Sequence, residues 1–184
     1  MHMEKLKNQE CYDKNGNMLG WFSRSVAVAV FIFRKKEDKI QVLLEKRGKG
    51  AADNIGKYCS VCGYLDFNET LTSAAARESF EETGIKINTD KLKFLKINSD
   101  PSENRQNVTV HYIYFADETE DFNIAKAKGG EKDEVETVGW FNIATFKTEK
   151  ELSVDIPKMY EMDFAFNHDK LIIEHLSKFF KISY

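Results

Sequence analysis

The pattern of apolar and polar positions predicts a chain rich in β-strands. Alternating or continuous apolar runs, with many β-branched and aromatic residues, predict strands at residues 25–33, 40–45, 91–98, 108–116 and 135–141. The run at 25–33 is apolar enough to be buried on both faces of a sheet. Ahead of it, residues 10–21 are expected to form a hairpin that turns at Asn15-Gly16, because Asn-Gly favours the positive φ angles of tight turns.

Two parts of the chain have helical patterns. Thr70 can cap a helix that runs to about Thr83, and Gly84 can supply the left-handed residue that ends it. The tail at 155–180 predicts two helices, and its apolar stripe consists of Leu171, Ile172, Leu176, Phe179 and Phe180. Strands on either side of a central helix, followed by C-terminal helices, predict an α/β/α sandwich around a mixed β-sheet. At 184 residues the chain is expected to form one domain, in which residues 1–20 are assigned to the N-terminal hairpin region and the tail helices of 155–184 pack on the same domain.

The last turn of the central helix carries three acids, Glu78, Glu81 and Glu82, where helix energetics disfavours them. Glu78 and Glu82 stand four residues apart on one face, and like charges at that spacing repel by about 0.2–0.5 kcal/mol. A carboxylate near a helix C-terminus is disfavoured by a further ~0.3–1 kcal/mol, because the macrodipole prefers cations there. A bound divalent cation would reverse both effects, and oxygen-only ligands suit a hard ion such as Mg²⁺ or Mn²⁺.

Residues 63–85 resemble the Nudix box, G-x5-E-x7-R-E-U-x-E-E-x-G-U, in which U is a bulky aliphatic residue. The matching positions are Gly63, Glu69, Arg77, Glu78, Glu81, Glu82, Gly84 and Ile85. Ser79 is the one departure, and it affects local packing more than chemistry. The alternative to a metal site is a solvated surface helix with an Arg77/Glu81 ion pair and a glycine C-cap.

The resemblance implies the α/β/α fold and hydrolysis of a nucleoside diphosphate linked to another moiety X, with Mg²⁺ or Mn²⁺ as cofactor. It implies that Glu78, Glu81 and Glu82 bind metal, together with the backbone carbonyl of Cys62, which precedes the box glycine. Arg77 is expected to orient a glutamate, and Glu69 to support the loop or an outer metal ion.

A general base is also required, and residues 133–141 resemble the acidic loop and strand that many Nudix enzymes place after the box. Glu134 is the first choice for a residue that binds metal or deprotonates water, and Glu136 is the second. Glu78, Glu81 and Glu82 remain alternatives, because the base varies within the family.

The substrate contacts are less strongly marked. Arg47 and Lys57 are candidates for phosphate binding, Tyr64 for stacking on a base, and Arg105 for contact with the ligand from the polar loop at 100–107. Each of these residues also fits an ordinary role as surface charge or packed aromatic.

Composition narrows the class of protein. The net charge of −3 argues against a nucleic-acid partner, for which a basic face is expected. The longest apolar run, at 26–33, is shorter than the roughly 20 residues that span a bilayer, and no secretory signal precedes it. Three cysteines favour reduced thiols in a cytoplasm over a disulfide framework. We therefore expect a cytoplasmic protein with a small-molecule partner, and a homodimer is possible.

Cys59 and Cys62 form a lone C-x-x-C, for which zinc binding and redox activity are the functional interpretations. A zinc site needs about four ligands, and no second pair stands at a suitable spacing. A redox pair more naturally opens a helix than ends a strand. Two small buried strand residues are therefore the preferred interpretation.

Two other classes of function remain open. A catalytically weak ligand-binding or sensor protein could keep this fold, but the complete set of box acids argues for an enzyme. An RNA-processing hydrolase of the same superfamily is disfavoured by the acidic balance of the chain.

Overall fold

The computed structural model describes residues 7–123, 133–154 and 161–183. Its elements in chain order are β1 (Gln9–Tyr12), β2 (Met18–Phe22), β3 (Ser25–Lys36), β4 (Lys39–Arg47), β5 (Tyr58–Cys59), β6 (Val61–Tyr64), α1 (Leu71–Thr83), the 3-10 turn η1 (Thr89–Lys91), β7 (Lys93–Asn98), β8 (Asn107–Ala116), β9 (Val135–Thr148), β10 (Glu151–Val154), α3 (His168–Leu176) and β11 (Lys181–Ser183). The five strands expected from the apolar pattern are all present. Four are longer than predicted, and β7 begins at Lys93 instead of residue 91, because Thr89–Lys91 form a 3-10 turn.

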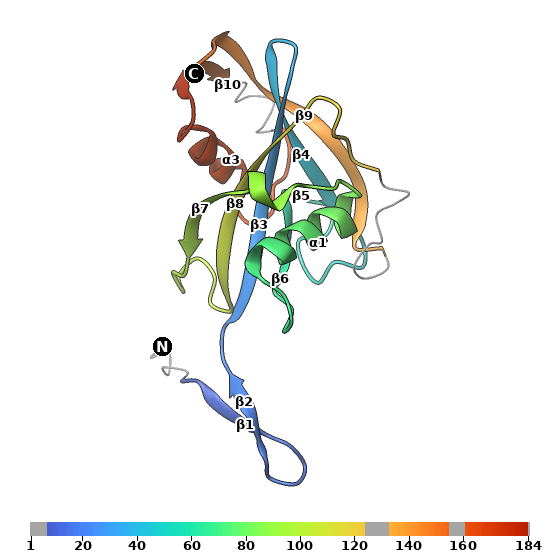
Figure 1. Cartoon of the computed structure of the whole chain (residues 1–184), viewed down its shortest axis with the longest axis vertical. Helices are drawn as coiled ribbons and strands as arrows, with labels where there is room; N and C mark the ends of the chain where they lie inside the picture. The colour runs from blue at the N-terminus through green and yellow to red at the C-terminus, as the bar shows by residue number, and fades with distance from the viewer. Residues whose placement is uncertain (1–6, 124–132, 155–160, 184) are drawn as a thin grey trace.

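Nine strands form one mixed sheet, shown in Figure 1. Its order is β11-β10-β9-β4-β3-β8-β7, with β5 paired to β4 and β6 paired to β3. The pairs β3–β8 and β10–β11 are parallel, and the other pairs are antiparallel. The expectation of a mixed sheet is therefore confirmed.

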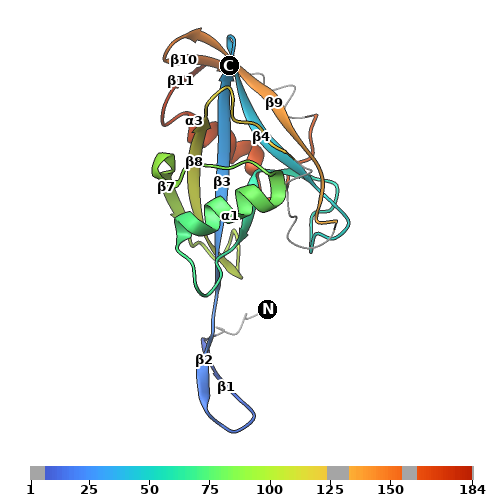
Figure 2. The same cartoon turned by 45° about the vertical axis from the view of Figure 1, so that its right-hand side comes forward.

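The two described helices lie on opposite faces of this sheet, as Figure 2 shows for α1 in front of β3 and α3 behind it. Alternate residues of β3 point to the two faces, because side chains alternate along a strand. Val28 belongs to the cluster that includes Ala74 of α1, whereas Phe31 belongs to the cluster that includes Ile172 of α3. This arrangement confirms the predicted sandwich. In the described ranges no helix is long and apolar enough to cross a membrane.

The central strands β3 and β4 run together over only part of their length. They pair from Phe33↔Val42 to Lys36↔Lys39. In the earlier part of β3, residues 27–30 pair with β6, and in the later part of β4, residues 45–46 pair with β5. The short β5 and β6 therefore fill the space where β3 and β4 separate, and α1 packs against β6. Side chains of β4, β5, β6 and α1 are brought together at this place.

The predicted N-terminal hairpin is confirmed, but it extends to Phe22. Strands β1 and β2 form a separate two-stranded sheet that projects from the body of the molecule (Figure 1). Its large apolar side chains are 51–71% exposed, and they are Tyr12, Met18, Leu19, Trp21 and Phe22. At its base, the Arg24 guanidinium donates to the carbonyl groups of Ser99, Asn104 and Asn107. A second copy of the chain is one surface that could cover these side chains, and the homodimer stays a prediction.

The tail departs from the expectation of two helices. Helix α3 is present, and its stripe residues pack in the core with Ile172 and Leu176 fully buried. Residues 161–167 are not helical, because their backbone pairs with β5: Tyr58 N–H donates to Asp163, and Ala165 N–H donates to Tyr58. The expected first helix is therefore wrong for these residues, and its start at 155–160 lies outside the described residues. The chain then ends in β11 instead of a longer helix.

Candidate metal and catalytic site

Helix α1 begins and ends where the sequence predicts. The Thr70 hydroxyl accepts from the backbone N–H of Ser73 at 3.2 Å, and Gly84 has φ 72° with its N–H donating to Phe80 at 2.8 Å. Ala74 is fully buried, so the helix lies close to the sheet. Ser79, the one departure from the box, is also buried, and its hydroxyl donates to the Ala75 carbonyl at 2.7 Å. The substitution is therefore accommodated within the helix.

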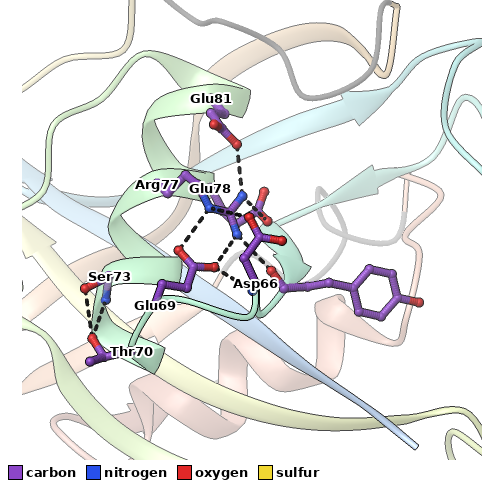
Figure 3. Close-up of polar contacts among 8 residues, drawn as sticks. Asp66, Glu69, Thr70, Ser73, Arg77, Glu78 and Glu81 are labelled. Carbon is purple, nitrogen blue, oxygen red and sulfur yellow. Dashed lines mark hydrogen bonds and ion pairs between the residues drawn. The ribbon is translucent and has the colours of Figure 1, made fainter. Parts of the chain in front are cut away.

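Arg77 binds three of the box glutamates, as Figure 3 shows. Its Nη1 donates to Glu78 Oε1 at 2.8 Å and to Glu81 Oε2 at 3.0 Å. Its Nη2 donates to Glu69 Oε1 at 2.6 Å and to the Tyr64 carbonyl at 2.8 Å. Glu69 Oε1 in turn accepts from the Asp66 N–H, which ties the loop before the helix to the same centre. The guanidinium lowers the pKa of Glu69, and the carboxylates raise the pKa of Arg77.

Glu82 lies deeper than the other box acids and is only 3% exposed. Its Oε2 accepts from the backbone N–H of Cys62 at 3.1 Å, so it faces β6. Burial raises the pKa of Glu82 well above its ordinary value, and the nearby charges of Glu45, Cys62 and Glu78 raise it further. Burial also raises the pKa of Glu78 in spite of Arg77. These carboxyl groups are held in an environment that disfavours their charged forms unless a cation is present.

Gly63 allows Glu78 to lie directly against β6. A Cβ atom at position 63 would stand 2.0 Å from Glu78 Oε1, which is closer than non-bonded atoms approach. If Glu78 binds metal as the sequence predicts, Gly63→Ala should displace its carboxylate and weaken Mn²⁺ binding about tenfold or more, which is the usual cost of disturbing the support of a metal ligand. Calorimetric titration with Mn²⁺ measures the change.

The matched control for this substitution is Gly139→Ala, whose new Cβ would meet only the Phe141 ring, at 3.3 Å. It should leave Mn²⁺ affinity unchanged. Equal affinities of Gly63→Ala and the unmodified protein would show that Glu78 is not needed where the structure holds it.

The site contains a carboxyl group that sequence reasoning missed. Glu45 of β4 is 1% exposed, and its Oε1 accepts from Cys59 Sγ at 3.1 Å and lies 4.0 Å from Arg47 Nη1. It also interacts with the Glu82 carboxyl, and burial raises its pKa to about 7. The sequence did contain a signal for Glu45, since this acid directly follows an apolar run that predicts a buried strand. A glutamate is rarely buried without a partner, so its position indicated a functional or paired carboxylate.

The structure separates the two candidates for the general base. The Glu134 carbonyl accepts from Gly48 N–H at 2.6 Å, directly ahead of the pairing of β9 with β4. Burial is the largest cause of the raised pKa of Glu78, and Arg77 opposes it. The charge of Glu134 raises this pKa further, and it also raises the pKa of Glu45. Glu134 therefore lies within electrostatic range of these two buried acids. Glu136 is exposed and bound to Lys46 Nζ at 2.9 Å, so it is not brought to them.

The proposed substrate contacts lie in different surroundings. Arg47 is 5% exposed and donates through Nε to the Asp53 carbonyl at 3.0 Å, so its guanidinium is enclosed beside Glu45. Lys57 Nζ lies 3.4 Å from Asp163. Tyr64 has an exposed side chain at the end of β6, next to the Arg77 centre. Arg105 is exposed in the loop between β7 and β8, at the base of the hairpin. Their roles stay predictions.

The C-x-x-C cysteines lie in neighbouring short strands. Cys59 is fully buried, Cys62 is partly buried, and both are free thiols. The neighbouring Cys62 and burial raise the pKa of the Cys59 thiol well above its ordinary value, so it stays protonated. Within the described residues, no three His, Cys, Asp or Glu side chains are arranged to enclose a metal ion. A preformed zinc site is therefore not found in this part of the chain.

The family model described as NUDIX domain matches residues 23–162. A search of curated proteins finds no match.

Similar solved structures share the fold at low sequence identity. The NUDIX domain of Shewanella oneidensis NrtR, complexed with ADP ribose, has a TM-score of 0.65 and 19% identity, over 91% of this chain and 93% of that one. A MutT/nudix family protein from Enterococcus faecalis has a TM-score of 0.64 and 22% identity, over 83% and 61%. A bifunctional NMN adenylyltransferase/ADP ribose pyrophosphatase from Francisella tularensis has a TM-score of 0.62 and 17% identity, over 84% and 41%.

Proposed function

Since the chain belongs to the NUDIX domain family, we propose that it is a metal-dependent pyrophosphohydrolase acting on a nucleoside diphosphate linked to another moiety X. The observation that carries the proposal is the convergence of Glu78, Glu82 and Glu134 at one place. Burial raises the pKa of Glu78 and Glu82, the charge of Glu134 raises that of Glu78 further, and the charge of Glu78 raises that of Glu82, which is costly without a cation.

The residues present fit Mg²⁺ or Mn²⁺. Glu78, Glu81 and Glu82 would hold the metal with the Cys62 carbonyl, and such an ion neutralises a diphosphate and lowers the pKa of an attacking water. Arg77 engages one oxygen each of Glu78 and Glu81. It therefore fixes their orientation and, within the described contacts, leaves the second oxygen for the metal. Glu134 is the proposed base that takes the proton from water.

A ligand sensor is the second candidate, and the likeness to NrtR favours it. One NrtR structure is complexed with ADP ribose and another with a 27mer DNA. The absence of a nucleic-acid partner therefore stays a prediction for this chain. The complete set of box acids supports the enzyme over the sensor, because a ligand-binding role does not require them all.

A substrate panel separates these functions. It covers nucleotide sugars, ADP-ribose, dinucleotides and nucleoside triphosphates, each with Mg²⁺ and with Mn²⁺. The proposal predicts metal-dependent release of a nucleoside monophosphate from at least one of them. Inactivity across the panel, with binding of one of these ligands intact, would favour the sensor.

The base is tested by pH–rate profiles of Glu134→Gln and Glu136→Gln. We expect Glu134→Gln to abolish the acidic limb of kcat, because that limb reports protonation of the base. Glu136→Gln should keep the limb, since Glu136 is paired with Lys46. If both variants keep it, the base lies within the box; if only Glu136→Gln loses it, the assignment is reversed.

A further inference from the structure

The buried carboxyl group of Glu45 lacks the partners that such a group requires. Its Oε2 is buried and has no hydrogen-bond partner among the described residues. Its Oε1 has a thiol, which is a weak donor, and Arg47 at 4.0 Å. Arg47 itself is held by Asp53, with Nη2 3.3 Å from Asp53 Oδ1. An unpaired polar atom in this position costs free energy, so the arrangement calls for a further group.

Glu82 stands beside Glu45 and is also deeply buried, and the described hydrogen bond to its carboxylate comes from the Cys62 N–H. The hydrogen bonds of Arg77 go to Glu69, Glu78, Glu81 and the Tyr64 carbonyl. None of those described reaches Glu45 or Glu82. The two most deeply buried carboxyl groups of the site, on β4 and α1, interact with each other where β3 and β4 separate.

We propose that Glu45 is a ligand of the divalent cation, shared with Glu82 and contributed by the sheet instead of the box. The inference rests on the proposed function, because it assumes that the box acids hold a metal. A carboxylate oxygen without a partner suits a hard cation, and one Mg²⁺ or Mn²⁺ would neutralise both groups. The ion would thus be held between helix and sheet. Arg77 keeps Glu81 at the outer side, where the side chain is 29% exposed.

The experiment measures Mn²⁺ binding to the full chain after removal of metal by a chelator. Calorimetric titration and the electron paramagnetic resonance signal of free Mn²⁺ both report the affinity without any substrate. We expect Glu45→Gln to weaken Mn²⁺ binding tenfold or more and to reduce the rise of the melting temperature that Mn²⁺ produces. The metal-free melting temperature should not fall, because the amide removes a buried acid without changing its size.

Glu151→Gln is the matched control, because Glu151 lies on β10 and its Oε2 is 3.7 Å from Lys181. It should bind Mn²⁺ as tightly as the unmodified protein. Glu45→Asp serves as a second variant if Glu45→Gln fails to fold. Its shorter carboxylate should weaken Mn²⁺ binding in a folded protein.

The outcomes separate this inference from the proposed function. If the unmodified protein binds Mn²⁺ and both Glu45 variants bind it equally well, Glu45 is not a ligand and the function stands. If Glu45→Gln melts at a lower temperature without metal but keeps its Mn²⁺ affinity, its role is structural and the inference is overturned. If the unmodified protein binds neither Mn²⁺ nor Mg²⁺, the proposed function itself fails.

Discussion

Replacing Glu82 by glutamine is expected to lower turnover by orders of magnitude while the fold stays intact. Glu82 interacts electrostatically with both Glu45 and Glu78. Its negative charge would therefore contribute strongly to the binding of a cation at this site. The glutamine side chain has nearly the same shape, and its carbonyl oxygen can still accept from the Cys62 N–H. The loss should therefore appear in kcat/KM at saturating metal, with an unchanged circular dichroism spectrum.

The control for this prediction is Glu103→Gln, a glutamate of the exposed loop between β7 and β8 that accepts a hydrogen bond from Asn98. Its kcat/KM should equal that of the unmodified protein. A Glu82→Gln variant with full turnover would remove Glu82 from the proposed ligands. A variant that loses its circular dichroism spectrum would instead assign Glu82 a structural role.

The second large effect is destabilisation by acid through three buried histidines. His111, His168 and His175 surround Phe31 on the α3 face of the sheet, with ring centroids 4.5–5.7 Å from the Phe31 ring. His111 Nδ1 lies 3.1 Å from His175 Nε2, and His168 Nδ1 accepts from Ser60 N–H at 3.0 Å. Burial lowers the pKa to about 4 for His111 and about 3 for His168 and His175.

These shifts determine the sign of the pH dependence. Below the ordinary histidine pKa of about 6.5, the unfolded chain binds protons that the folded protein excludes. The contribution of the three neutral histidines to the free energy of unfolding is therefore complete above about pH 6.5 and is lost as the pH falls toward 4 and 3. Each histidine contributes a slope of about 1.4 kcal/mol per pH unit within this range. Urea unfolding at a series of pH values from 7 to 4 measures the free energy of unfolding.

The comparison for this prediction is with His175→Phe, which removes one titrating group. The free energy of unfolding of this variant should fall less steeply as the pH is lowered. Glu45 acts in the opposite direction, because its raised pKa makes stability fall as the pH rises between about 4.5 and 7. That contribution is the same in both proteins and cancels in the comparison. Equal slopes in the two proteins would show that His175 is not neutral and buried in solution.

The sequence predicted well those features that depend on neighbouring residues. The caps at Thr70 and Gly84 and the contacts of Arg77 with Glu81 follow from helical spacing, and the structure has them. The choice between Glu134 and Glu136 was not decided by spacing. It depends on the pairing of β9 with β4, which turns Glu136 toward Lys46.

Features that depend on distant contacts were missed. Glu45 looked like the end of an alternating strand, but β4 continues to Arg47 and pairs with β5 beside Cys59. The tail was expected to be helical ahead of α3, yet Ala165 pairs with Tyr58, more than a hundred residues earlier. Neither pairing produces a recognisable pattern in the neighbouring sequence. The partner in both cases is β5, which has only two residues and joins the sheet through contacts with distant parts of the chain.

The separation of β3 from β4 has a consequence for how cation binding and folding are coupled. Glu45, Glu82 and Glu134 come from three segments that meet only when β5 and β6 occupy the space between the central strands. A peptide that contains the box alone lacks two of these acids and the surface that buries the third. The proposed affinity for a divalent cation would thus be a property of the assembled sheet, and a rising concentration of free metal ion would add to the free energy of unfolding.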